Sequence, residues 1–218
     1  MVVKDRTIVC SDSVSDAGDK YRRIAESIGE HGWCVTPEFI SPLLVSQLQQ
    51  ETDQLWRKGK FRHAGVGRGD NFEINPKIRT DHVLWLNHHQ VSGAQKLYFE
   101  ALEQLRLAIN QQLYLGLMDF EAHFAVYPKN CYYKKHLDQF RGIGTRTVSA
   151  ILYLNNDWNE KHGGQLRLYT GQNSMDQYVD ILPHTGTLVT FLSARFLHEV
   201  LPAIRPRKSI TGWFKRRE

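Results

Sequence analysis

Cysteine is scarce in this chain of 218 residues, which contains only Cys10, Cys34 and Cys131. Their number is odd, their spacings are wide and no CxxC pair occurs. The sequence therefore predicts neither a disulfide framework nor a structural zinc site. This cysteine usage favours a reducing compartment, and we expect a cytoplasmic protein.

Long apolar runs are also missing. No run of about 18 apolar residues occurs, which excludes a transmembrane helix and argues against a membrane partner. The first residues contain no continuous apolar segment of the kind that a secretory signal needs. Hydrophobic residues make up 41% and charged residues 23%, values that exclude disordered, collagen-like and coiled-coil classes. We expect a single domain over residues 1–218, and the net charge of +5 fits either a nucleic-acid partner or a basic surface.

The first half of the chain has helical periodicity. An apolar face predicts a short helix from about residue 19, and Ser41 followed by Pro42 predicts the start of a second helix. A third helix is predicted over 94–115, where apolar residues form a stripe. Between the last two helices, the polar, glycine-containing stretch 58–81 predicts a long loop. We expect residues 19–115 to form a helical support.

After Met118 the apolar period changes from that of a helix to that of a strand. Turn signals divide this half into eight short predicted strands: 121–127, 132–137, 147–155, 165–169, 178–181, 187–191, 198–203 and 209–214. This pattern predicts a sandwich, barrel or jelly roll as the core of the protein, over 118–214.

Two histidines and one aspartate could form a metal site. His136 and Asp138 are two residues apart in a predicted strand, so both side chains would point to one face. His198 precedes another predicted strand. Two histidines and a carboxylate on a rigid scaffold form the facial triad that suits non-haem Fe(II) and leaves coordination positions open. The alternatives are a surface His-Asp pair and a buried histidine bonded to a backbone carbonyl.

An arginine and several hydroxyls could bind a carboxylate. Arg207, Thr211 and Trp213 share one face of the last predicted strand with Ser209. A guanidinium fork beside hydroxyls suits a carboxylate, because it donates two charge-assisted hydrogen bonds. Tyr153, on another predicted strand, could complete this site. The alternatives are a surface arginine and a half-buried core tyrosine.

The order of these motifs resembles the iron(II)/2-oxoglutarate-dependent oxygenases, and among them the prolyl hydroxylases. The matching segments are YPKN at 127–130, HLD at 136–138, ILYLNNDW at 151–158, GGQLRLY at 163–169 and HEVLPAIRPRKSITGWF at 198–214. Upstream, GWCV at 32–35, GKF at 59–61 and IRTDHVLWL at 78–86 extend the likeness. The subgroup that it resembles comprises the hypoxia-inducible-factor prolyl hydroxylases and their bacterial relatives that act on elongation factor Tu.

The resemblance implies a mainly β fold, a double-stranded β-helix (jelly roll) with N-terminal α-helices packed on it. It implies that His136, Asp138 and His198 bind Fe(II), and that Arg207 binds the distal carboxylate of 2-oxoglutarate. Other roles that it implies fall on residues around these. Tyr153 and Thr211 would contact that carboxylate, Tyr127 the metal-binding end of 2-oxoglutarate, Trp213 the pocket wall, and Arg79 and Asp81 the mobile substrate loop.

The implied reaction is hydroxylation of a prolyl residue in a protein substrate, with elongation factor Tu as one candidate. Fe(II) is the implied cofactor, 2-oxoglutarate and O2 are co-substrates, succinate and CO2 are co-products, and ascorbate is a possible reductant. The stretch 58–81 would be a lid over the site.

Three alternatives remain open at the level of sequence. The same chemistry could act on a free amino acid or another small molecule. The positive charge could mark a nucleic-acid-binding protein or a nucleic-acid demethylase, although no nucleic-acid-binding motif is visible. A non-catalytic β-barrel could bind the metal structurally, but such a site would need neither open coordination positions nor a carboxylate anchor.

Overall fold

The structure is a computed structural model, and it describes residues 3–4, 8–10, 17–67, 69, 72–87, 90–139, 144–171 and 177–217. Residues 68, 70 and 71 of the predicted loop 58–81 lie outside the described residues, as do residues 142 and 143 of a predicted turn.

Three α-helices form at the predicted places: α1 (Ala17–His31), α2 (Pro42–Arg57) and α3 (Gly93–Leu113). The Ser41 hydroxyl caps α2 by accepting a hydrogen bond from the Leu44 amide, with Pro42 in the first turn. Ser92 caps α3 in the same way. Helix α1 runs through Gly29 to His31, and Gly32, at φ +86°, ends it in a conformation that suits glycine.

Twelve strands and one 3-10 helix, η2 (Glu160–His162), complete the described elements. The strands of the first half are β1 (Val3–Lys4), β2 (Trp33–Thr36), β3 (Arg62–His63) and β4 (His82–Trp85). Those of the second half are β5 (Leu117–Tyr127), β6 (Tyr133–His136), β7 (Arg146–Tyr153), β8 (Leu166–Tyr169), β9 (Gln177–Ile181), β10 (Leu188–Leu192), β11 (His198–Val200) and β12 (Arg207–Arg216). All eight strands predicted after Met118 are present, with shifted ends.

The strands form two sheets that face each other as in a jelly roll. The smaller has the order β1-β9-β8-β11-β6 and the larger β2-β10-β7-β12-β5-β4-β3. All pairs between these strands are antiparallel except β1 with β9. Strands β2, β3 and β4 thus join the larger sheet from the first half of the chain. The sequence analysis predicted 58–81 as loop, but β3 begins within it and pairs with β4 at the sheet edge.

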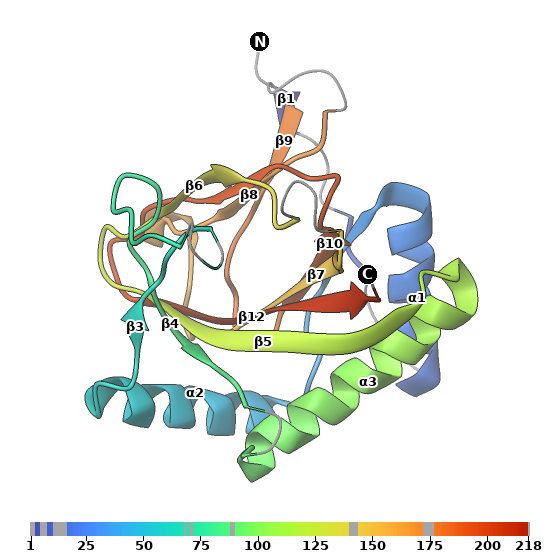
Figure 1. Cartoon of the computed structure of the whole chain (residues 1–218), viewed down its shortest axis with the longest axis horizontal. Coiled ribbons are helices and arrows are strands. Elements are labelled where there is room, and N and C mark those ends of the chain that lie inside the picture. The colour runs from blue at the N-terminus through green and yellow to red at the C-terminus, as the bar shows by residue number, and fades with distance from the viewer. Residues whose placement is uncertain are drawn as a thin grey trace.

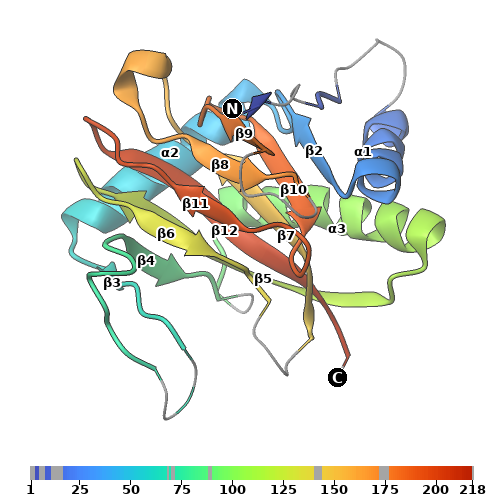
Figure 2. The same cartoon turned by 90° about the horizontal axis from the view of Figure 1, so that it is seen from above.

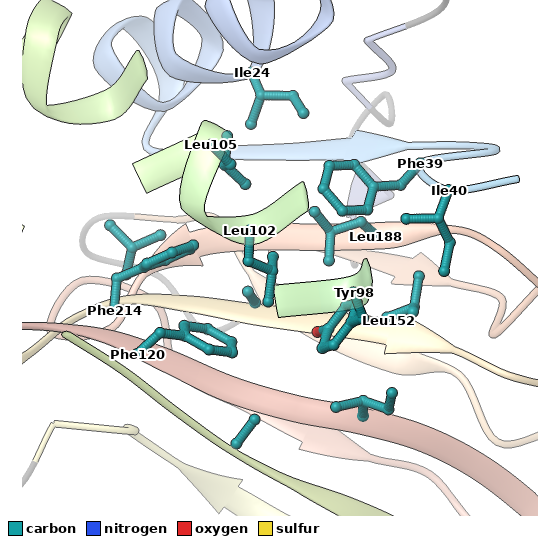
Figure 3. Close-up of a cluster of buried hydrophobic side chains, with 14 of the residues drawn as sticks. Ile24, Phe39, Ile40, Tyr98, Leu102, Leu105, Phe120, Leu152, Leu188 and Phe214 are labelled. Carbon is teal, nitrogen blue, oxygen red and sulfur yellow. The ribbon is translucent and has the colours of Figure 1, made fainter. Parts of the chain in front are cut away.

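The helices cover one face of the larger sheet (Figure 1). A buried cluster joins residues of the helices, such as Leu102 and Leu105, to residues of the sheet, such as Leu152 and Phe214. Figure 3 shows these side chains between the helical and the sheet layers. Burial of each such side chain contributes about 1.5–3 kcal/mol, so this layer holds the sheet rigid from one side.

The other face of the larger sheet is covered by the smaller sheet, on the side opposite the helices (Figure 1). Ile151 and Val189 of the larger sheet pack with Leu166, Leu168 and Val179 of the smaller one. Strand β7 is therefore buried on both faces from Val148 onward, which explains why its sequence is a continuous apolar run rather than an alternating one.

One cysteine pair departs from the expectation of no disulfide. Val9 and Val35 form a parallel bridge, and this pairing brings Cys10 beside Cys34, to which it is disulfide-bonded with Cα atoms 6.5 Å apart. The partners are 24 residues apart in sequence, so only the tertiary structure reveals the pair. Cys131 is a free cysteine. Among the described residues, no helix has the length and apolar character that a bilayer crossing requires.

Candidate metal centre and adjoining cavity

The predicted metal ligands meet between two neighbouring strands of the smaller sheet. His198 of β11 lies directly opposite His136 of β6 in the antiparallel pair, and the centroids of their rings are 4.1 Å apart. Asp138 Oδ1 lies 3.5 Å from His136 Nε2, and Asp138 Oδ2 lies 3.6 Å from His198 Nε2. One ligand atom from each residue lies within 4.8 Å of the others, so the three side chains could hold a metal ion together.

The prediction that His136 and Asp138 share a strand is wrong. It placed both residues in a single strand, but β6 ends at His136 and Asp138 lies in the bend that follows. The carboxylate reaches the histidines because the Ser149 hydroxyl, on β7 of the facing sheet, donates a 2.7 Å hydrogen bond to Asp138 Oδ2. Sheet-to-sheet packing, rather than strand alternation, orients this ligand.

Hydrogen bonds around the histidines leave the same nitrogen of each ring available for a metal. His136 Nδ1 lies 2.7 Å from the carbonyl oxygen of Lys134, and His198 Nδ1 lies 3.1 Å from that of Phe196. When Nδ1 donates to these carbonyls, Nε2 carries the lone pair that a metal ligand needs. Tyr133 stacks on the His136 ring at 3.5 Å and restricts its rotation.

The charge states also suit a cation. Burial lowers the pKa of His198 to about 4, which keeps its imidazole neutral at neutral pH. Burial opposes ionisation of Asp138, but the nearby His198 and His136 and the Ser149 hydroxyl outweigh it and hold the pKa of that carboxyl well below its usual range. The site therefore offers a neutral imidazole at His198 and an ionised carboxylate at Asp138.

A cavity of about 960 Å³ adjoins the triad and contains most of the other predicted site residues. Tyr127, Arg207, Thr211, Trp213 and Arg79 line it together with the triad. Its walls come from both sheets and from the segment between β3 and β4. The described parts of that segment extend away from the two sheets (Figure 2).

Arg207 is a buried cation that forms no ion pair with any described residue. Its side chain is 1% exposed, and its Nε donates to the Gly164 carbonyl at 2.9 Å. Within the described part of the chain, its Nη2 has no hydrogen-bond partner, and neither has the buried hydroxyl of Tyr153, whose ring lies 5.0 Å from the guanidinium. Burial raises the pKa of Tyr153 to about 12, so this hydroxyl stays a donor. A buried charge of this kind is costly unless a ligand pairs with it, and a carboxylate fits both donors.

Tyr127 and Thr211 lie close to this anchor. Tyr127 is buried, its ring lies 5.1 Å from the Arg207 guanidinium, and burial raises its pKa. Thr211 Oγ1 lies 3.4 Å from the Ser209 hydroxyl on the same face of β12. Of the face predicted from alternation along β12, Arg207, Thr211 and Trp213 line the cavity.

Aromatic rings line part of the cavity. His123 lies between Trp85 and Trp213, with ring centroids 5.0 and 5.6 Å away. Burial lowers the pKa of His123 to about 4. Trp213 is also covered by Arg146, whose guanidinium carbon lies 3.6 Å from the ring centroid. Trp213 is thus among the residues that line the cavity.

Arg79 and Asp81 form a buried ion pair at the base of the segment between β3 and β4. Arg79 donates to both carboxylate oxygens, at 2.8 and 2.6 Å, and Asp81 is 0% exposed. The Arg79 guanidinium also lies 4.1 Å from the Tyr133 ring, and Arg79 bridges to the Tyr133 backbone. Burial opposes the charge of Arg79, but its hydrogen bonds to Asp81 raise the pKa above the ordinary value. The pair links this segment to the strand that carries His136.

Sequence reasoning missed Ser149, Tyr133, His123 and Gly164 as parts of the site. Nothing in the sequence around Ser149 predicts a bond to Asp138. Gly164 has a clearer signal, the GG pair after η2. Its φ is +71°, and a Cβ there would lie 3.3 Å from Cδ of Arg207, so glycine leaves room for the guanidinium to cross.

The geometry defines a class: a jelly roll with a His-Asp-His triad beside a buried arginine in one cavity. Comparison with known proteins supports this class. A family model of the 2OG-Fe(II) oxygenase superfamily matches residues 122–215. A crystal structure of a Pseudomonas putida prolyl-4-hydroxylase is 41% identical, with a TM-score of 0.81, and the match covers 91% of this chain and 100% of that one.

Two further relatives extend the match. A Trichoplax adhaerens prolyl hydroxylase, solved with a peptide of a hypoxia-inducible factor, is 28% identical with a TM-score of 0.80 over 90% of this chain and 91% of that one. The human Egl nine homolog 1 is 32% identical over 88% of this chain, but the chain spans only 45% of that relative's length. The chain belongs to the prolyl hydroxylase family of 2OG-Fe(II) oxygenases, and the predicted double-stranded β-helix fold is confirmed.

Proposed function

We propose that this protein is an Fe(II)- and 2-oxoglutarate-dependent dioxygenase that hydroxylates a prolyl residue of a protein substrate, at the 4-position. The observation that carries the proposal is the buried, unpaired Arg207 in the same cavity as the triad. A structural metal site would not need a buried cation beside it, whereas a co-substrate with a second carboxylate would.

His136, Asp138 and His198 are assigned as the Fe(II) ligands. The residues fit the ion, because a two-histidine, one-carboxylate set suits Fe(II) and leaves positions for a bidentate co-substrate and for dioxygen. Ser149 and the backbone carbonyls of Lys134 and Phe196 hold the ligands in orientation, as supporting groups of metal sites do.

The distal carboxylate of 2-oxoglutarate is assigned to Arg207 Nη2 and the Tyr153 hydroxyl, with Thr211 nearby. Tyr127 would lie toward the keto acid end, and Trp213 would wall the pocket. When bound, iron and 2-oxoglutarate supply the oxidation: O2 is split between succinate, formed with loss of CO2, and the new hydroxyl group of the substrate. The protein contributes orientation and a site from which bulk water is excluded.

The substrate is proposed to be a protein with an accessible proline, and elongation factor Tu is one candidate. Arg79 and Asp81 would set the position of the substrate loop, about 58–81, over the cavity. We assign residues 118–214 as the oxygenase core and 19–115 as its helical support and substrate loop. The setting would be cytoplasmic, and ascorbate would serve as a reductant that keeps the iron ferrous.

The test is mass spectrometry of elongation factor Tu and of proline-containing peptides after incubation with the protein, Fe(II), 2-oxoglutarate and O2. We expect one added oxygen atom on a prolyl residue, and stoichiometric succinate. His136→Ala should abolish both, whereas His184→Ala, at an exposed histidine outside the cavity, should retain them. Succinate formation with small molecules and with no prolyl substrate would refute the protein-hydroxylase assignment.

A further inference from the structure

A basic segment, residues 57–63 with the sequence RKGKFRH, lies between the end of α2 and the mouth of the cavity. Its four permanent cations are exposed: Arg57, Lys58, Lys60 and Arg62. Among the described residues, none of these four forms an ion pair. Arg57 and Lys58 have an ordinary explanation, since cations are favoured at the C-terminus of a helix. Lys60 and Arg62 lie beyond the helix.

The backbone holds this segment in one conformation. Gly59, at φ +64°, ends α2 with its amide bonded to the carbonyl of Trp56, while the Lys60 amide bonds to that of Leu55. This is a Schellman cap, and it sets the direction in which the chain leaves the helix. Phe61 then packs edge-on against Trp56, with centroids 5.4 Å apart.

Anchoring of Phe61 directs its two neighbours to the opposite side. In an extended chain, alternate side chains share a face, so Lys60 and Arg62 lie on one face and Phe61 lies on the other. Both line the cavity that holds the triad, as does His63. Two basic residues in the cavity wall are neutralised within the protein, Arg79 by Asp81 and Arg146 by Glu121. Lys60 and Arg62 are exposed at the entrance, where a large ligand would reach them.

We propose that Lys60 and Arg62 bind an acidic stretch that flanks the target proline, and so select protein substrates in which aspartate or glutamate lies near that proline. This rests on the proposed prolyl hydroxylation. In an extended peptide, residues i and i+2 lie on the same face, with the same spacing as Lys60 and Arg62. Two acidic residues at such positions can therefore each pair with one of the two cations. Nucleic acid is disfavoured, because both rings of the segment already pack within the protein, Phe61 on Trp56 and His63 on His82, and are not free to stack on a base.

The experiment uses peptides with one central proline that differ only in whether the flanking residues are aspartate, asparagine or lysine. Hydroxylation rates are measured with the full chain, Fe(II) and 2-oxoglutarate at two salt concentrations. We expect the aspartate peptide to have the lowest KM, and its advantage to shrink at high salt. The double variant Lys60→Glu/Arg62→Glu should raise the KM of the aspartate peptide about tenfold and lower that of the lysine peptide.

A matched double variant, Lys96→Glu/Lys161→Glu, changes the net charge equally at two exposed lysines outside the cavity. It should leave the order of the three peptides as in the wild type. Equal KM values for aspartate and lysine peptides, or the same shift in both double variants, would overturn the charge selection while leaving prolyl hydroxylation intact.

Binding is measured separately from turnover, with protein loaded with Mn(II) and an inert 2-oxoglutarate analogue. Fluorescence anisotropy should show the labelled aspartate peptide binding more tightly to the wild type than to Lys60→Glu/Arg62→Glu. Absence of hydroxylation in every peptide, with this binding difference present, would count against the proposed reaction and not against the charge selection. Tighter, salt-sensitive binding of a single-stranded RNA that displaces the aspartate peptide would overturn the proposal.

Discussion

Replacement of Arg207 by methionine tests the carboxylate anchor, because it removes the charge while keeping a long, flexible side chain. Arg207 is 1% exposed, and its Nε donates a hydrogen bond to the Gly164 carbonyl. Methionine would lose that hydrogen bond, worth about 1 kcal/mol, but would also remove the cost of burying an unpaired charge. We therefore expect the ligand-free variant to be as stable as the wild type, or more stable by about 1–2 kcal/mol.

Co-substrate binding should change in the opposite direction. Loss of one partner of a buried, hydrogen-bonded charge pair costs about 2–5 kcal/mol, which raises the Kd of 2-oxoglutarate about 30-fold to a few thousand-fold. At a concentration 100 times Kd, a ligand stabilises the folded state by about 2.7 kcal/mol. For a chain of this size that is a rise in Tm of about 5–10 °C in the wild type. At the same concentration, a Kd raised 30-fold or more leaves about 0.9 kcal/mol at most, so the rise in the variant should be about 3 °C or less.

Thermal denaturation of Mn(II)-loaded protein, with and without 2-oxoglutarate, measures both effects together. Arg205→Met is the matched control, since Arg205 lies two residues away, outside the cavity, and donates to the Asp157 carbonyl. Arg205→Met should keep the full rise in Tm that 2-oxoglutarate produces in the wild type. The reasoning is refuted if Arg207→Met retains the 2-oxoglutarate-induced shift, or if its ligand-free form loses several kcal/mol of stability, since Arg207 would then be a structural residue.

Three further changes follow from the geometry. Ser149→Ala should lower metal affinity about 10- to 100-fold, measured by titration with Mn(II), because Asp138 loses its orienting hydrogen bond; unchanged affinity would contradict that role. The pKa of His123 is about 4 in the folded state and 6.5 ordinarily, so below pH 6.5 the unfolded chain binds a proton that the folded one does not. His123 should therefore account for a fall in stability of about 3 kcal/mol between pH 6.5 and 4, and His123→Leu should remove that contribution from the denaturation profile. Asp81→Asn leaves the buried Arg79 unpaired and should cost about 3 kcal/mol locally, seen as faster proteolysis between β3 and β4; an unchanged cleavage rate would argue against it.

Much of the fold was predictable, because it rests on local signals. Ser41-Pro42 gave the start of α2, apolar stripes gave α3, and the change to alternating residues gave the eight strands after Met118. The short strands β3 and β4 were not predictable. Arg62 and His63 are too few to show the alternating apolar and polar pattern of a strand. They form a strand only because β4 lies beside them.

The site was predictable in its residue types and not in its construction. The triad, Arg207 and Tyr153 were chosen from spacing and from family resemblance, and the structure brings the triad and Arg207 to one cavity. The strand argument for Asp138 was wrong, since the bond from Ser149 in the facing sheet orients it. That bond depends on sheet packing, which no local pattern encodes.

The sequence by itself determined the helices and the strands after Met118, the donor types and the surplus of positive charge. Hydrophobic period, caps and side-chain chemistry are properties of residues and their near neighbours, so they can be read along the chain. Only the tertiary structure decided where the charge acts. It buries Arg207 without an anion, neutralises Arg79 and leaves Lys60 and Arg62 exposed at the cavity mouth, because burial and pairing depend on contacts between distant segments.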